Sequence, residues 1–312
     1  MQPGRSCPLH YRYAPQDLAR VPDFHADTLY VIGGLYGNVP ALEAVLALAA
    51  RENAPVVLAF NGDFNWFNID DAAFRAINHV VLRHHALRGN VETEIADDDT
   101  NAGCGCSYPE WVADAEVERS NAITVKLRNT ARRHPDLRAR LAALPMHLVA
   151  EVGGVRIAVV HGDLESLAGW SLSQEALATE GAIFIVKKQI VKSECRIVAS
   201  SHSCLPVALA LDCEVGRCAI FNNGAAGMPN FQAADYGVIT RIATTPCTVQ
   251  NTLYGTRIEG VYIDALAVNY DKLRWQDAFL KAWPRGSAAY ESYYQRICAG
   301  PAYSTARAIR LL

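Results

Sequence analysis

The chain has 312 residues, with 29 lysine and arginine residues against 32 aspartate and glutamate residues, and so a net charge of −3. Its 51% hydrophobic and 20% charged residues allow a packed core, which excludes an intrinsically disordered protein. The charges are mixed in sign, and no basic stripe marks a nucleic-acid partner. No run approaches the ~18 consecutive apolar residues of a membrane span. The composition predicts a soluble globular protein with one large domain or two small ones.

Nine cysteines are spread along the chain without any CxxC pair. This spacing argues against a zinc ribbon and against a small disulfide-rich secreted fold. The first residues, MQPGRSCPLHYRY, lack the apolar stretch of a signal peptide. We therefore expect a cytoplasmic protein with reduced cysteines, several of them buried as small hydrophobic side chains.

The first ninety residues alternate between strand and helix patterns. Apolar runs at 29–32, 56–60 and 85–87 predict buried strands, and helical spacing of apolar residues predicts helices over 39–50 and 70–82. Polar residues follow each strand. This alternation favours an α/β fold with a ligand site beyond the carboxyl ends of the strands.

After residue 145 the pattern changes, and short β-type runs separated by glycine turns predict a second sheet. The later elements are, in chain order, a polar loop at 97–110, mostly helix over 112–143, strands at 148–151, 155–160, 196–200, 207–211 and 218–221, further strands within 236–268, and helices at 275–283 and 288–297.

The expected organisation has three parts. Prolines break any regular pattern in residues 1–27, which we expect to be irregular, and the main domain spans 28–250. The remaining residues, 251–312, are rich in aromatic side chains. They form an extension that packs on the same domain, makes a homo-oligomer interface, or covers the site as a cap.

Six polar motifs stand at the ends of predicted strands, in this order: Gly33-Gly34-Leu35-Tyr36-Gly37-Asn38, Asn61-Gly62-Asp63, Arg88-Gly89-Asn90-Val91-Glu92, Val160-His161-Gly162-Asp163, Ser201-His202-Ser203-Cys204 and Asn222-Asn223-Gly224-Ala225-Ala226. Each is weak alone. Together their order resembles the calcineurin-like metallophosphoesterase superfamily, whose motifs read D-x-H-G-N, G-D-x-x-D, G-N-H-[DE], H-G, G-H-x-H and N-x-G-S. The resemblance covers roughly residues 29–230. It implies a four-layer α/β/β/α sandwich with two mixed sheets and two metal ions at one edge of them.

The resemblance implies that one of these two metal sites is complete. In the family, that ion is held by the aspartate of G-D, the asparagine of G-N, the histidine of H-G and the first histidine of G-H-x-H. The residues at those positions are Asp63, Asn90, His161 and His202. Two imidazoles, one carboxylate and one amide oxygen suit Zn²⁺, Mn²⁺ or Fe²⁺. We therefore expect one tightly held divalent transition metal per chain.

The same comparison implies that the other metal site is largely lost. Gly34 and Tyr36 stand at the aspartate and histidine of D-x-H, and Cys204 stands at the last histidine of G-H-x-H. Only Asp63, which the two sites share, remains. Val91 replaces the histidine that assists the attacked phosphate in the family.

Alternatives stay open for several of these residues. Cys204 is either a buried core cysteine, a thiolate ligand of the metal, or a nucleophile beside His202. Tyr36 either packs at the glycine turn or contacts the substrate, as Asn90 and Asn223 are also expected to do.

Two neighbouring segments also leave alternatives open. Cys104 and Cys106 lie in a loop that can fold over the site, either as incidental thiols, as a redox-active pair, or as soft ligands at the vacated metal position. Trp66 and Phe67 make the rim beside the metal aromatic. They contact either an apolar part of the substrate or residues 1–27.

The motifs predict a hydrolase of small-molecule phosphate esters. Asp63, His161 and His202 are its expected catalytic and metal-binding residues, since one metal ion can activate water against phosphorus. Two other readings remain. One is a metal-binding protein without turnover that binds a phosphorylated ligand or a partner, and the other is an enzyme with thiol-assisted chemistry at Cys204.

Overall fold

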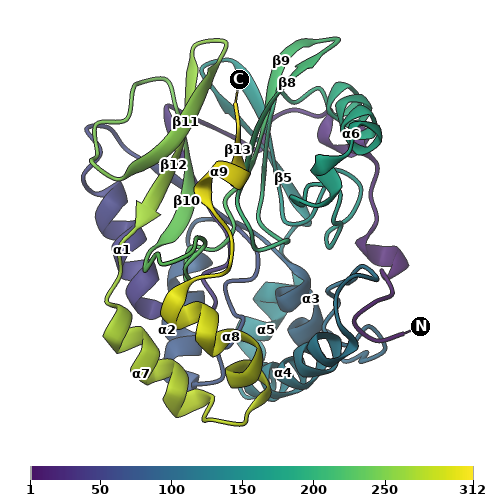
Figure 1. The fold of residues 1–312 in the computed structure, drawn as a ribbon, viewed down its shortest axis with the longest axis vertical. Helices are drawn as coiled ribbons and strands as arrows, with labels where there is room; N and C mark the ends of the chain where they lie inside the picture. The colour runs from purple at the N-terminus through teal and green to yellow at the C-terminus, as the bar shows by residue number, and fades with distance from the viewer. Residues whose placement is uncertain (1, 312) are drawn as a thin grey trace.

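The computed structural model describes residues 2–311, which form two β-sheets with helices against them (Figure 1). The strands are β1 Phe24–Ala26, β2 Thr28–Ile32, β3 Val57–Asn61, β4 His85–Leu87, β5 His147–Val152, β6 Val155–Val160, β7 Ile197–Ser200, β8 Val207–Cys213, β9 Gly216–Asn222, β10 Gly237–Ala243, β11 Thr252–Ile258, β12 Val261–Val268 and β13 Ile309–Arg310. The α-helices are α1 Val39–Ala49, α2 Asp71–Val81, α3 Asn90–Ala96, α4 Asp114–Arg132, α5 Pro135–Ala142, α6 Glu180–Ser193, α7 Lys272–Ala282, α8 Ala288–Ala299 and α9 Thr305–Ala308. Short 3₁₀ helices are η1 Leu9–Tyr11, η2 Pro15–Leu18 and η3 Ala176–Ala178.

Both sheets are mixed, as predicted. In the first, ordered β11-β12-β10-β2-β3-β4, the strands β2, β3 and β4 are parallel and the other pairings are antiparallel. The second has the order β1-β5-β6-β7-β9-β8-β13 and contains both kinds of pairing. The prediction of a second sheet after residue 145 is therefore confirmed for β5 to β9, whereas β10 to β12 belong to the first sheet.

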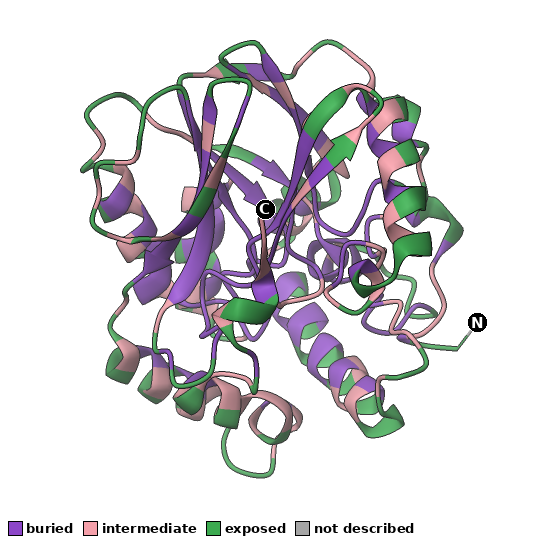
Figure 2. Cartoon of the chain, turned by 45° about the horizontal axis from the view of Figure 1, so that its top comes forward, coloured by how far each residue is buried: buried purple, intermediate pink, exposed green. Residues whose placement is uncertain are grey.

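The two sheets face each other across an apolar core. Leu29 and Val31 of β2 pack in one cluster with Ile157 and Val159 of β6 and Phe221 of β9. Figure 2 shows that the strands are buried along most of their length. Helices α1 and α2 cover the outer face of the first sheet, and α6 covers that of the second. This is the predicted four-layer α/β/β/α arrangement.

Phe221 offers a direct test of this core. Its side chain is 1% exposed between the sheets, so Phe221→Ala is expected to lower the free energy of unfolding by about 3–5 kcal/mol through lost apolar burial and a residual cavity. Urea denaturation measures the change. Leu273→Ala, at a side chain that is 73% exposed, is the control and should stay within about 0.5 kcal/mol of the wild type.

Three helices, α3, α6 and α9, were not predicted from the sequence. Helix α3 begins inside the third motif, at Asn90, and all but its last residue are buried, so it has no amphipathic pattern. In α6, five consecutive apolar residues mask the helical period, and Phe184 and Ile185 among them are exposed. Residues 1–27 also contain more order than expected, because η1, η2 and β1 lie there.

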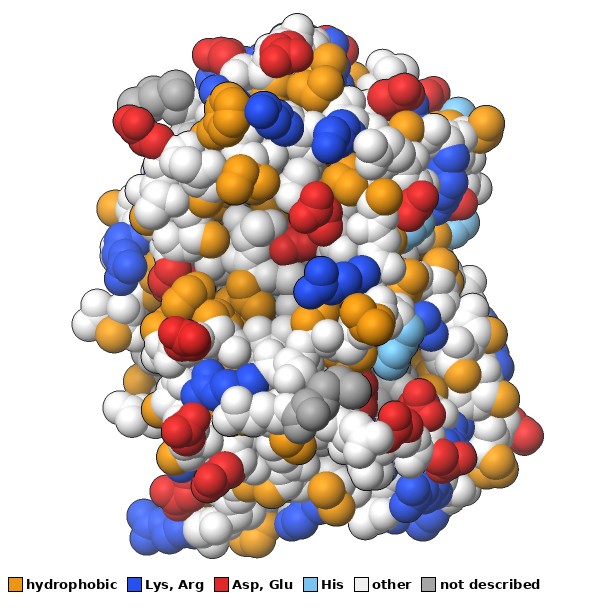
Figure 3. All heavy atoms as spheres, turned by 90° about the vertical axis from the view of Figure 1, so that its right-hand side faces the viewer, with side chains coloured by type: hydrophobic (Ala, Val, Ile, Leu, Met, Phe, Trp, Pro, Cys, Tyr) orange, Lys and Arg blue, Asp and Glu red, His pale blue; other side chains and the backbone are white. Residues whose placement is uncertain are grey.

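No helix within residues 2–311 is long and apolar enough to cross a membrane. On the face drawn in Figure 3, acidic and basic side chains are interspersed, in line with the mixed charge of the sequence.

Candidate metal centre

The predicted site residues lie where strands of both sheets end. Asp63 follows β3 and Asn90 opens α3 after β4, both in the first sheet. His161 follows β6, and His202 and Cys204 follow β7, in the second sheet. Because each sheet supplies part of the group, the site lies at the edge that the two sheets share.

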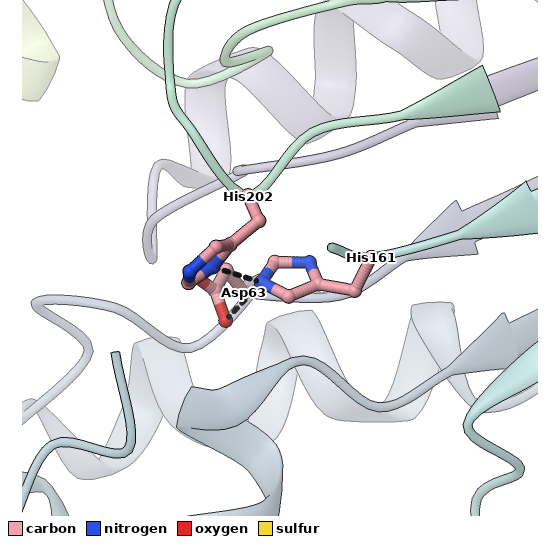
Figure 4. Close-up of side chains that lie close together, drawn as sticks. All are labelled: Asp63, His161 and His202. Atoms are coloured by element: carbon pink, nitrogen blue, oxygen red, sulfur yellow. Dashed lines mark hydrogen bonds and ion pairs between the residues drawn. The ribbon is translucent and has the colours of Figure 1, made fainter. Parts of the chain in front are cut away.

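Asp63, His161 and His202 form a buried cluster whose candidate ligand atoms all lie within 4.8 Å of one another (Figure 4). His161 Nε2 is 3.3 Å from Asp63 Oδ1 and 3.1 Å from His202 Nδ1. It is also 3.1 Å from Asn90 Oδ1. The four residues that the family resemblance assigns to one metal are thus brought together around His161 Nε2.

Backbone carbonyls fix both imidazole rings. His161 Nδ1 lies 2.8 Å from the carbonyl oxygen of Asn61, and His202 Nε2 lies 3.0 Å from that of Cys106. A carbonyl oxygen only accepts hydrogen bonds, so these two nitrogens carry the protons. In the neutral rings, His161 Nε2 and His202 Nδ1 therefore turn their lone pairs towards the centre. Such carbonyl partners commonly orient metal-binding histidines.

Asn90 is oriented in the same way. Its Nδ2 donates to the carbonyl oxygen of Cys104 at 2.9 Å, which turns Oδ1 towards His161. Two imidazole nitrogens, a carboxylate oxygen and an amide oxygen then converge with only electron pairs between them. Such a group is repulsive by itself and becomes favourable around a cation. The donor set fits Zn²⁺, Mn²⁺ or Fe²⁺.

The pKa values of the cluster reflect the same crowding. Burial disfavours the charged forms of Asp63 and His161. The opposite charges of these two residues and the hydrogen bond between them outweigh this effect, so the pKa of Asp63 is lowered and that of His161 is raised. Burial, and then the neighbouring His161, lower the pKa of His202 to about 3. His202 is therefore neutral at pH 7. In the absence of a metal ion, a proton on His161 supplies the positive charge that balances Asp63.

A buried glutamate holds the backbone of Asp63 in place. Asp63 has a left-handed φ of 54°, and its N–H donates to Glu92 Oε2 at 2.7 Å. The same carboxylate accepts from the N–H groups of Gly89 and Asn65. Burial raises the pKa of Glu92 to about 7. Glu92 belongs to the third motif, but its role could not be predicted from the sequence, because its partners are backbone groups that a motif does not reveal.

The residues at the other metal position do not fit an ion. A Cβ on Gly34 would lie only 2.8 Å from Cζ of Tyr36, so the phenol ring occupies the space that an aspartate would need there. The Tyr36 hydroxyl lies 2.8 Å from Cys204 Sγ. Burial raises the pKa of both Tyr36 and Cys204, which keeps both neutral. Cys204 lies outside the Asp63–His161–His202 cluster, and its sulfur pairs with Tyr36 instead.

A cavity of about 40 Å³ opens beside the cluster. Five of its eleven lining residues are tyrosine or tryptophan, and the full lining is Tyr36, Asp63, Trp66, Asn90, Val91, Cys106, Tyr108, Trp170, His202, Cys204 and Tyr293. The volume accommodates a few water-sized groups, so the larger part of any ester has to extend through the mouth of the cavity.

Asn223, expected to contact substrate, does not line this cavity, and its side chain donates to the carbonyl oxygen of Val238. Trp66 and Phe67 pack against Tyr293 of α8, and Phe67 also against Phe279 of α7, rather than against residues 1–27. The C-terminal extension therefore builds one wall of the site.

Tyr108 and Trp170 were not singled out from the sequence. Both lie in stretches without regular periodicity, and Trp170 is brought to the site by its Nε1–H, which donates to the carbonyl oxygen of Cys106 at 2.9 Å. The one sequence feature that could have indicated a role for Tyr108 and Trp170 is their position in loops that follow strand-end motifs.

Cys104 and Cys106, for which the sequence left several roles open, form a disulfide, whereas the other seven cysteines are free. Gly103 and Gly105, both with a φ of 65°, turn this loop back on itself and bring the two Cα atoms to 5.4 Å. The carbonyls of the two cysteines are those that orient Asn90 and His202. The disulfide loop thus supports two of the four candidate ligands.

Opening this disulfide is expected to weaken metal binding. In the double variant Cys104→Ser/Cys106→Ser the loop gains freedom, and the carbonyls that orient Asn90 and His202 are held less firmly. Loss of such outer contacts typically costs 10–100-fold in metal affinity, so we expect a decrease of about 10-fold, measured by competition with a chelator. Cys7→Ser/Cys298→Ser, outside this loop, is the control and should bind as the wild type does. An unchanged affinity in the loop variant would contradict the supporting role.

No protein-family model matches the chain, and no curated protein does. Among solved structures, a metallophosphoesterase from Sphaerobacter thermophilus matches with a TM-score of 0.55 at 16% identity, covering 88% of this chain and 100% of that one. A hypothetical protein from Pyrococcus horikoshii also matches with a TM-score of 0.55, at 20% identity, covering 88% of this chain and 99% of that one. The chain has the calcineurin-like metallophosphoesterase fold, which confirms the resemblance seen in the motifs.

Proposed function

We propose that the protein is a metal-dependent phosphoesterase that hydrolyses a small-molecule phosphate ester with one divalent transition metal ion. Asp63, Asn90, His161 and His202 would hold the ion. One observation carries the proposal: four electron-pair donors converge in a buried cluster, at the strand ends of a metallophosphoesterase fold, beside a cavity. The name of the Sphaerobacter protein supports the reaction class.

An ion in this group would polarise a phosphoryl oxygen and lower the pKa of a water molecule. The chain's own residues provide the geometry. The carbonyls of Asn61 and Cys106 keep both imidazoles in the tautomer that can bind the ion, and Glu92 fixes the backbone of Asp63. Asp63, His161 and His202 are all buried, so little bulk water contacts the cluster. This arrangement strengthens the electrostatic attraction between the site and a phosphate.

The test is hydrolysis of p-nitrophenyl phosphate and bis(p-nitrophenyl) phosphate by protein loaded with Mn²⁺, Zn²⁺ or Fe²⁺. We expect metal-dependent turnover that falls by about 10²-fold or more in His161→Ala and in His202→Ala, since each removes a ligand of the ion. His25→Ala, at a histidine outside the site whose side chain is 66% exposed, is the control and should retain the wild-type rate. Equal rates in the wild type and both site variants would reveal a contaminating phosphatase and contradict the proposal.

A second function, binding of a phosphorylated ligand without turnover, is favoured by one observation. The phenol of Tyr36 fills the position of the other metal, and the apolar Val91 stands where the family has a histidine. Full metal occupancy without hydrolysis of any ester in a broad panel, together with binding of inorganic phosphate, would establish this function instead.

A further inference from the structure

We propose that Tyr36 takes over the role of the lost metal ion as the second contact to the phosphoryl group. Its hydroxyl would donate a hydrogen bond to a phosphoryl oxygen of the bound ester, and the sulfur of Cys204 would hold that hydroxyl in place while the cavity is empty. The inference rests on the proposed function and adds to it a catalytic group and a substrate class.

The position of the phenol supports this role. Tyr36 is only 2% exposed, and it lines the cavity together with Asp63, His202 and Cys204. Its ring lies in the space left by the missing side chain of Gly34. The backbone N–H of Tyr36 donates to the carbonyl oxygen of Asp63 at 3.3 Å, so the backbone of Tyr36 is held beside that of a candidate metal ligand.

The backbone at both members of the pair is strained. Tyr36 has a φ of 55° and Cys204 a φ of 59°, in the left-handed region that side chains of this size rarely adopt. Such conformations cost free energy and concentrate at functional sites. Arg296 of α8 holds the backbone of Cys204 by donating to its carbonyl oxygen at 2.6 Å. Two strained residues from separate loops thus meet through their side chains at the cavity.

The chemistry of the pair makes the hydroxyl available. Cys204 Sγ lies 3.2 Å from the carbonyl oxygen of His202, to which its S–H donates, so the Tyr36 hydroxyl is the donor in the contact with sulfur. Sulfur is a weak acceptor, whereas an anionic phosphoryl oxygen accepts a much stronger, charge-assisted hydrogen bond. Rotation of the hydroxyl hydrogen from sulfur to such an oxygen is therefore favourable and requires no movement of the ring.

Replacing a metal ion with a neutral donor also changes the charge that the site can balance. No lysine or arginine is among the residues that line the cavity, so Asp63 reduces the charge of one divalent ion to a net +1. A phosphate monoester carries about −1.5 to −2 at neutral pH, whereas a diester carries a single negative charge. The charge balance therefore favours a phosphodiester, and we expect kcat/KM for bis(p-nitrophenyl) phosphate to exceed that for p-nitrophenyl phosphate by at least about 10-fold.

The experiment compares Mn²⁺-loaded wild type with Tyr36→Phe and Cys204→Ala. Tyr36→Phe should keep one equivalent of metal, bind inorganic phosphate about 10-fold more weakly in calorimetry, and lose about 10²-fold in kcat/KM for the diester, as removal of one oxyanion donor does elsewhere. Cys204→Ala should bind phosphate at least as tightly as the wild type, because the hydroxyl no longer has to leave the sulfur. Tyr303→Phe, which loses a buried hydroxyl bonded to the carbonyl oxygen of Pro206, controls for stability alone.

Several results would overturn the proposal. Loss of the metal from Tyr36→Phe would make the phenol a ligand rather than a donor. If Tyr36→Phe and Cys204→Ala lowered phosphate affinity and kcat/KM equally, the contact between the two side chains would be structural only. If the wild type preferred the monoester, the proposed substrate class would be wrong. If the wild type hydrolysed neither ester while Tyr36→Phe still weakened phosphate binding, the proposed function would fail and the donor role would stand.

Discussion

Asp63→Asn is expected to release the metal ion and to abolish metal-dependent hydrolysis. Asp63 supplies the only carboxylate in the cluster, and an asparagine there keeps the volume but removes the negative charge that a divalent cation requires. Without that charge, the pKa of His161 falls as well, because the charge and hydrogen bond of the carboxylate contribute most to raising it. Elemental analysis after gel filtration should give one equivalent for the wild type and none for the variant.

The matched control is Asp271→Asn at the start of α7. Asp271 accepts a hydrogen bond from the N–H of Arg274 as the N-cap of that helix, and asparagine caps a helix equally well. This variant should keep both its metal and its activity. Two equivalents of metal in the wild type, both surviving mild chelation, would contradict the one-metal expectation on which this prediction rests.

The sequence predicted the fold well because the order of the strand-end motifs constrains topology. Asp63, Asn90, His161 and His202 were expected at strand ends, and the structure brings all four together at one edge of two sheets. Strands β2, β3 and β4 were also predictable, since their runs are short and are followed by Gly33, Asn61 and Arg88, whereas β1 was not expected. Local signals were sufficient at these positions.

Features that depend on contacts distant in sequence were not predictable. The disulfide between Cys104 and Cys106 requires a loop turned by glycines at positive φ, and spacing alone left several roles open. Tyr293 was visible only as one of many aromatic residues near the C-terminus, and its place in the cavity wall follows from the packing of α8 against α4.

The pairing of Tyr36 with Cys204 is the clearest example of this limit. The motifs showed that three positions around one metal had changed, but not that the new side chains contact one another. Loss of the aspartate at Gly34 makes room for the phenol, so the replacements depend on each other physically. In the sequence, the changes at Gly34, Tyr36 and Cys204 are three separate losses of metal ligands. In the structure, a contact between Tyr36 and Cys204 occupies the place of the metal site.

Because the replacements are coupled, only a joint reversal is expected to restore the second metal. The triple variant Gly34→Asp/Tyr36→His/Cys204→His recreates the family's ligands around Asp63. We expect its metal content to rise from one equivalent to two in elemental analysis. Aspartate tolerates the left-handed φ of 59° at position 34 better than most residues, and its Cβ, 3.2 Å from Cα of Ala225, requires a backbone shift of only a few tenths of an ångström.

The double variant Gly34→Asp/Cys204→His, which keeps Tyr36, is the informative control. Its phenol ring still fills the space that the new aspartate needs, since a Cβ at position 34 lies 2.8 Å from Cζ of that ring. We expect it to hold one equivalent of metal. In the triple variant, a second ion held by the restored ligands would add a contact to the phosphate, and a gain of about 2.7 kcal/mol in transition-state stabilisation corresponds to about 10²-fold in kcat/KM. A folded triple variant that still binds one equivalent would show that the phenol is not what excludes the second ion.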